Sequence, residues 1–118
     1  MQVPLQITFR EMAPSAAIDE RLREKAVWLE QFCNDITACH VVVEERHRHQ
    51  HQGRLFHVRI DMTVPSNVLV VNREPHEHHA HEDVYVAIRD AFDAARRQLE
   101  DYVRVQRGDH RGERARSR

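Results

Sequence analysis

Histidine is the residue type that most suggests chemistry here, because seven of the ten histidines fall in two polar stretches, residues 45–53 and 74–81. Neutral imidazole is a ligand for zinc, copper and nickel, and alternate positions of an extended segment place side chains on one side. The weak metal-ligand candidates are His47, His49, His51, His76, His78, His79 and His81. No cysteine joins them, and histidine-rich loops are commonly just solvated, so we expect no cofactor. A third interpretation is that both stretches gain positive charge as the pH falls towards about 6.5.

Arginine is the second residue type whose distribution suggests chemistry. Residues 94–118 carry eight arginines against four acidic residues, although the whole chain has a formal net charge of −1. The planar guanidinium group binds phosphate with two hydrogen bonds and stacks on bases. Yet arginines four positions from an acidic residue are typical of ion pairs on a solvated helix face. This spacing occurs in Arg89–Asp93, Asp93–Arg97, Arg96–Glu100 and Glu100–Arg104. Phosphate binding and surface ion pairing therefore both stay open.

Catalytic motifs are missing from the sequence. It contains no G-x-S-x-G turn, no phosphate-binding glycine loop and no H-E-x-x-H helix. His57 and Asp61 lie on one face of an alternating strand pattern and suggest acid–base work, but a solvated sheet face explains them more simply. Cys33 and Cys39 are too few for a disulfide framework, and Cys39 fits a small core residue. We therefore predict that the protein is not an enzyme.

Hydrophobic periodicity predicts the elements that position these residues. Apolar residues alternate with polar ones in the strand segments, and they recur every three or four positions in the helical segments. Pro14 and Ser15 supply the start of the first helix, whose apolar stripe runs from Ile18 to Phe32. The predicted strands are residues 3–10, 36–44, 54–64 and 68–73, and the second helix is residues 82–106.

The order of these elements predicts an α+β fold, β-α-β-β-β-α. A helix between the first two strands implies a parallel crossover, and short loops imply that strands two to four form an antiparallel meander. The fold is then a four-stranded sheet with two parallel helices on one face, and both histidine-rich loops lie at one end of it. Residues 1–106 form the domain, and residues 107–118 form a mobile arginine-rich tail.

The composition is that of a soluble globular chain, with 41% hydrophobic and 31% charged residues. No stretch approaches the roughly 20 apolar residues that span a bilayer. The N-terminal residues Met1–Pro4 lack the basic and apolar regions of a signal peptide. We therefore expect a cytoplasmic protein with no membrane partner.

Three stretches carry a resemblance to a known family: Ile7–Arg10, Ile18–Phe32, and Glu82–Ile88 with its continuation to Leu99. Together with the element order, they resemble the ribosome hibernation-promoting and ribosome-associated inhibitor family (sigma-54 modulation proteins), over residues 5–106. The resemblance implies a fold related to the double-stranded-RNA-binding domain. It also implies a short-form translation inhibitor, active in stress or stationary phase, that occupies the mRNA and tRNA channel of the small ribosomal subunit and contacts its rRNA. No DNA partner is expected.

The resemblance also implies a basic surface along the two helices and the adjoining strand ends. The residues of this sequence that match that surface are Arg10, Arg21, Arg23, Lys25, Tyr85, Arg89, Arg96, Arg97 and Arg104. The sequence departs from the family at Ala26, Trp28 and Ala94, which stand at or near positions where members often carry lysine. The alternative interpretation is a protein-interaction module, or a metal-binding module that uses the histidine loops, on the same fold.

Overall fold

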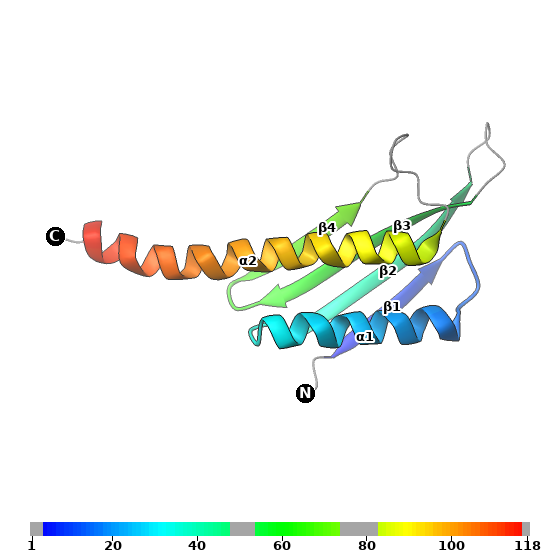
Figure 1. Cartoon of the computed structure of the whole chain (residues 1–118), viewed down its shortest axis with the longest axis horizontal. Helices are drawn as coiled ribbons and strands as arrows, with labels where there is room; N and C mark the ends of the chain where they lie inside the picture. The colour runs from blue at the N-terminus through cyan, green and yellow to red at the C-terminus, as the bar shows by residue number, and fades with distance from the viewer. Residues whose placement is uncertain (1–3, 48–53, 74–82, 117–118) are drawn as a thin grey trace.

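The computed structural model describes residues 4–47, 54–73 and 83–116 of the 118-residue chain. Its elements follow the order β-α-β-β-β-α (Figure 1). The strands are β1 (Leu5–Arg10), β2 (Ala38–His47), β3 (Arg54–Val64) and β4 (Asn67–Arg73), and the helices are α1 (Ala16–Phe32) and α2 (Val84–Arg116). The α+β class and the element order predicted from the sequence are confirmed.

The four strands form one mixed sheet in the order β1-β2-β3-β4. β1 pairs with β2 in parallel, with Ile7 opposite Val41, and β2, β3 and β4 pair antiparallel. Only Pro65 and Ser66 separate β3 from β4, and Ser66 has a φ of 71°, as the second central residue of a type II turn requires. β1, β2 and β4 therefore run in the same direction, as the sequence predicted.

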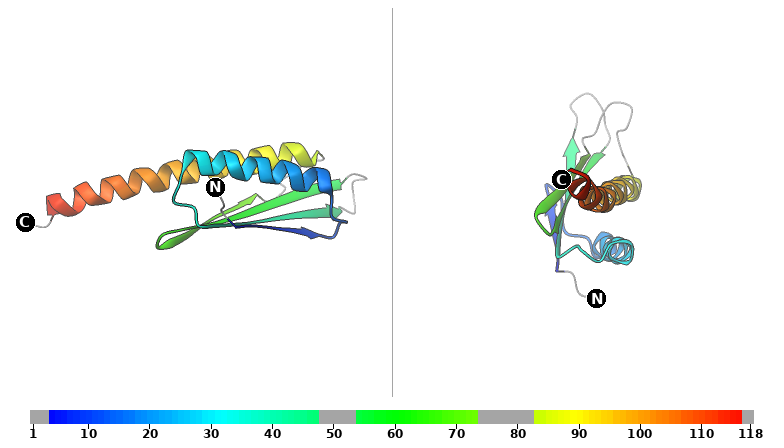
Figure 2. Two further views of the ribbon diagram at one scale, coloured as in Figure 1. Left: turned by 90° about the horizontal axis from the view of Figure 1, so that it is seen from below. Right: turned by 90° about the vertical axis from the view of Figure 1, so that its left-hand side faces the viewer.

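Both helices cover one face of the sheet and run parallel to each other (Figure 1 and Figure 2). Ser15 caps the start of α1, because its Oγ accepts a hydrogen bond of 3.2 Å from the backbone N–H of Ile18. On the sheet, Val58, Ile60 and Met62 point at the helices and are at most 1% exposed, whereas Arg59 between them is exposed. This alternation gives the sheet one dry face and one open face, and the helices bury the dry one.

The core lies between the helix pair and the dry face of the sheet. Its fully buried side chains come from both helices and from the central strands, so no element is stable without its neighbours. The largest are Phe92, Leu22, Leu29, Ile60, Met62, Ile88 and Leu99.

Two predicted element boundaries were wrong. β2 begins and ends later than the predicted segment 36–44, because Arg46 and His47 pair with Leu55 and Arg54 of β3 and extend the ladder. α2 continues to Arg116 instead of ending at Gln106. No proline interrupts residues 107–116, and a glycine costs a helix only about 1 kcal/mol. The mobility of the tail stays a prediction.

Phe32 was predicted to end the buried stripe of α1, and this was wrong. Ile18, Leu22, Ala26 and Leu29 are buried as expected, but Phe32 is 39% exposed. The next buried side chain is Cys33, whose N–H bonds to the carbonyl of Leu29 at 2.9 Å as α1 ends. Because 3.6 residues make one turn, the stripe drifts and either residue 32 or 33 can face the core.

Cys39 is buried in β2, as predicted, and is expected to be chemically inert. Burial, together with the negative charges of Asp61 and Glu30, raises the pKa of its thiol from 9.0 to about 12. The thiolate is the reactive form, and Cys33 is also buried. A thiol reagent at pH 8 should therefore label neither cysteine in the native protein and both in denaturant. Rapid labelling of one thiol in the native state would contradict this.

The raised pKa also predicts how stability depends on pH. Above pH 9 the unfolded chain loses the Cys39 proton while the folded chain keeps it up to about pH 12, so folding becomes less favourable across this window. Each unit of pKa difference corresponds to about 1.4 kcal/mol. Urea unfolding at pH 8 and pH 10.5 should show a smaller loss of stability in Cys39→Ala than in the unchanged protein. An equal loss in both proteins would contradict this prediction.

Candidate functional site

The helix pair carries a line of alternating cations and aromatic rings where α1 and α2 lie side by side. The Arg21 guanidinium carbon of α1 lies 4.9 Å from the centre of the Tyr85 ring at the start of α2. Farther along, Arg96 of α2 lies 5.7 Å from the Trp28 ring and 5.2 Å from the Phe32 ring. Lys25 Nζ lies 5.2 Å from the Trp28 ring. These contacts bring together residues that are up to 68 positions apart in the sequence, as Trp28 and Arg96 are.

We call this line the helix seam. The spacing of its residues is that of one stripe on each helix, because side chains three, four and seven positions apart lie above one another. The seam consists of Arg21, Lys25, Trp28 and Phe32 of α1 and Tyr85, Arg89 and Arg96 of α2.

The seam cations remain accessible despite their acidic neighbours. Arg21 lies 3.6 Å from Glu24, and Arg96 lies 3.4 Å from Glu100, but about half of each arginine side chain is exposed. Exposed ion pairs of this kind contribute about 0–1 kcal/mol, so a stronger anion displaces them. Cation–π contacts at exposed sites contribute a similar amount. The guanidinium groups therefore remain available to bind an external anion, although each already contacts an acidic neighbour in the protein.

Only part of the predicted basic set belongs to the seam. Arg21, Lys25, Tyr85 and Arg96 meet there through cation–π contacts, and Arg89 shares their stripe on α2. The remaining four predicted residues, Arg10, Arg23, Arg97 and Arg104, lie elsewhere on the surface.

The four other basic residues occupy separate positions. Arg10 ends β1 and is exposed, and Arg97 is exposed beside the hollow between β4 and α2. Arg23 Nε donates to Asp19 at 2.6 Å, two positions away from the seam stripe of α1. Arg104 contacts Asp101. The structure therefore places these residues on at least two sides of the molecule.

The predicted pairs four positions apart form only in part. Arg96 does contact Glu100, but Arg104 contacts Asp101 instead of Glu100. Arg89 contacts its neighbour Asp90 at 3.4 Å instead of Asp93. Surface pairs are too weak to fix one geometry, so sequence spacing alone does not determine which acid is chosen.

The open face of the sheet carries a polar network instead of a catalytic pair. His57, 7% exposed, donates from Nε2 to Asn72 Oδ1 at 2.6 Å, and its Nδ1 accepts from Arg46 at 3.3 Å. Glu44 lies 3.7 Å from the same Nδ1. Asp61 pairs with Arg59 at 3.0 Å, so the structure gives no contact between His57 and Asp61. Strand pairing explains this network, since these residues come from adjacent strands.

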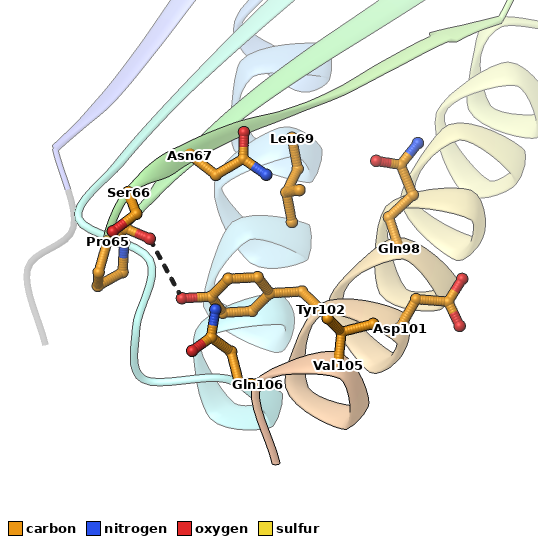
Figure 3. A pocket seen from close by; sticks show the side chains of 9 residues that line it. All are labelled: Pro65, Ser66, Asn67, Leu69, Gln98, Asp101, Tyr102, Val105 and Gln106. Carbon is orange, nitrogen blue, oxygen red and sulfur yellow. Dashed lines mark hydrogen bonds between the residues drawn. The ribbon is translucent and has the colours of Figure 1, made fainter. Parts of the chain in front are cut away.

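A hollow of about 470 Å³ lies between the β3–β4 turn and α2 (Figure 3). Tyr102 donates from its hydroxyl to the Pro65 carbonyl at 3.4 Å and ties the turn to the helix. Burial, together with the nearby Asp35 and Cys33, raises the pKa of Tyr102 above its ordinary value of 10.0. The lining offers one carboxylate, Asp101, which contacts Arg104. The lining also carries the hydroxyls of Ser66 and Tyr102.

The histidine candidates lie largely outside the residues that the structure describes. His49, His51, His76, His78, His79 and His81 fall in the gaps 48–53 and 74–82, and His47 is described only as the last residue of β2. Among the side chains that the structure describes, no three from His, Cys, Asp or Glu are grouped to hold a metal ion. Metal binding by these loops, and their gathering at one end of the sheet, stay predictions.

Neither α1 nor the described part of α2 has the length and apolar character of a membrane span.

Comparison with known proteins agrees with the fold. Residues 5–107 match the family model described as "Sigma 54 modulation protein / S30EA ribosomal protein". A ribosomal subunit interface protein from Coxiella burnetii aligns with a TM-score of 0.66 and 16% identity, over 83% of this chain and 94% of that chain. The N-terminal domain of Thermus thermophilus Protein Y aligns with a TM-score of 0.60 and 18% identity, over 86% and 99%. These low identities show a shared fold, and no curated protein matches the sequence. Because the family model spans most of the chain, the protein belongs to the sigma-54 modulation protein / S30EA ribosomal protein family.

Proposed function

We propose that the protein is a cytoplasmic ribosome hibernation factor that binds rRNA of the small subunit in the mRNA and tRNA channel and blocks translation by occupying it. The observation that carries the proposal is the family match over residues 5–107. The solved relative that is named a ribosomal subunit interface protein supports a ribosomal partner. Steric occupancy needs no catalytic group.

The helix seam is the surface that we assign to rRNA contact. Arg21, Lys25, Arg89 and Arg96 supply four cations along one line of the helix pair. Phosphate contacts with arginine and lysine provide most of the sequence-independent affinity for RNA. A rigid helix pair holds these cations in place, so binding orders few additional side chains. Because these four cations lie close together on one surface, a chain with a net charge of −1 can still present a local phosphate-binding site.

Sedimentation through a sucrose gradient tests the proposal. Purified protein mixed with ribosomes of its own species is expected to migrate with the small subunit or the whole ribosome in low salt. If four phosphates are neutralised, raising the salt from 50 to 200 mM should weaken binding roughly 100-fold. The protein should also inhibit translation of a reporter mRNA in an extract.

Two outcomes would contradict the proposal. The first is migration only at the top of the gradient at every salt concentration. The second is binding to ribosomes that leaves translation unchanged at saturation, since occupancy of the channel cannot be silent. Competition by mRNA and tRNA distinguishes the channel from other ribosomal sites, because a protein in the channel is displaced by them.

A further inference from the structure

Aromatic rings form part of the helix seam in a way that phosphate binding alone does not require. Trp28 is half-buried and has two cations near its ring, Lys25 at 5.2 Å and Arg96 at 5.7 Å. Phe32 is 39% exposed and lies 5.2 Å from the same Arg96. Tyr85, 36% exposed, repeats the pattern with Arg21 at 4.9 Å. The seam thus leaves three aromatic rings partly exposed next to cationic side chains.

We propose that the seam binds unpaired nucleobases by stacking on Trp28, Phe32 and the guanidinium of Arg96, so that its ligand is single-stranded RNA. The inference rests on the proposed function and specifies the kind of RNA that the seam takes. Phosphate oxygens make no use of an aromatic face, whereas every base has a face that stacks on one. A duplex already stacks its own bases, so only a single strand offers them to the protein.

Arg96 has the central role in this arrangement. The rings of Trp28 and Phe32 both lie within cation–π distance of its guanidinium group, and Glu100 lies 3.4 Å from its Nε. These contacts keep the guanidinium group beside the two rings, and arginine planes are established stacking partners for RNA bases. The same residue also carries a charge for the adjoining phosphate. One side chain therefore serves both the base and the backbone of a nucleotide.

The length of the seam sets the scale of the ligand. Tyr85 and Arg96 are eleven positions apart on α2, which corresponds to about 16 Å along the helix axis. Cation–aromatic pairs stand at both ends of this distance, and Lys25 and Arg89 lie between them. A short run of nucleotides in an extended conformation fits this length, with bases stacked at the two ends and phosphates between.

The single tryptophan of the chain provides a direct measurement. Trp28 fluorescence is followed while single-stranded oligoadenylate, a matched RNA duplex, or inorganic polyphosphate is added to the full chain. Stacking of a base on the indole should quench the emission with oligoadenylate. Polyphosphate should bind at low salt without comparable quenching, and the duplex should bind more weakly than the single strand.

Two variants separate stacking from charge. Phe32→Leu keeps the fluorescent reporter and the helix, and it should weaken oligoadenylate binding by about 5- to 150-fold, as expected for the loss of one stacked base. Trp28→Leu, measured by fluorescence anisotropy of a labelled oligonucleotide, should do the same. Val27→Leu changes an exposed α1 residue outside the seam stripe and should leave binding unchanged. Thermal unfolding confirms that each variant is folded, and Phe32→Leu alone decides the matter if Trp28→Leu does not fold.

Several results would overturn the inference. These are binding of oligoadenylate without a change in Trp28 emission, equal affinity of Phe32→Leu and the unchanged protein, or no binding of oligoadenylate at low salt. If ribosome association in the sucrose gradient persists in any of these cases, the stacking inference fails and the proposed function stands. If ribosome association is also absent, the proposed function fails with it.

Discussion

Reversing three seam charges, with Arg21→Glu, Lys25→Glu and Arg96→Glu together, is expected to lower ribosome affinity by at least about 100-fold. Each change removes a phosphate contact and places a negative charge where a phosphate would lie. Losing three phosphate contacts should lower the slope of log affinity against log salt concentration by about three. At physiological salt this corresponds to a large loss of affinity. Pelleting of ribosomes with labelled protein over a range of concentrations measures the affinity.

A matched triple makes this test specific to the seam. Arg23→Glu, Arg97→Glu and Arg104→Glu alter the same two helices and, like the seam triple, change the net charge from −1 to −7. These exposed residues lie off the seam, so only long-range repulsion should act, with a loss below about 10-fold that fades at higher salt. Equal losses for the two triples would show that the binding surface is not the seam. Circular dichroism checks that both triples keep their helices.

The fold was predictable because its signals are local and repeated. Alternation over Phe56, Val58, Ile60 and Met62 predicted both the span of β3 and the face that it buries. The one helix between β1 and β2 fixed the parallel pairing, and short connections fixed the meander. Each of these features depends on a pattern repeated over several residues, so one residue that departs from the pattern does not change the prediction. The topology could therefore be predicted almost completely.

The boundaries and the seam depend on contacts that the local pattern does not contain. The extension of β2 is polar, and only its partner strand β3 makes it a strand. The meeting of Arg21 with Tyr85, and of Trp28 with Arg96, requires knowing how two distant helices are rotated about their axes. The spacing of Arg21, Lys25, Trp28 and Phe32 was visible in the sequence. Periodicity alone, however, does not distinguish a stripe next to the buried face of a helix from the margin of that buried face.

Phe92 and Phe32 separate the role of a core residue from that of a seam residue in one experiment, because the same substitution should have different consequences at the two sites. Phe92 is fully buried in α2, whereas Phe32 is 39% exposed in the seam. Phe92→Ala removes a large buried ring and leaves a cavity, which typically costs about 3–5 kcal/mol. Since domains of this size have a stability of about 5–15 kcal/mol, the variant should lose a large share of its stability and unfold at a clearly lower urea concentration.

Phe32→Ala should cost clearly less folding free energy than Phe92→Ala, about 1–2 kcal/mol, since the Phe32 ring is partly exposed and its loss leaves no enclosed cavity. Urea unfolding followed by circular dichroism measures both variants without depending on Trp28. A cost for Phe32→Ala near that of Phe92→Ala would show that the Phe32 ring belongs to the core, as the sequence stripe had indicated. A small cost combined with weakened RNA binding separates the two roles: Phe92 maintains the domain, and Phe32 is available to a ligand because the core does not need it.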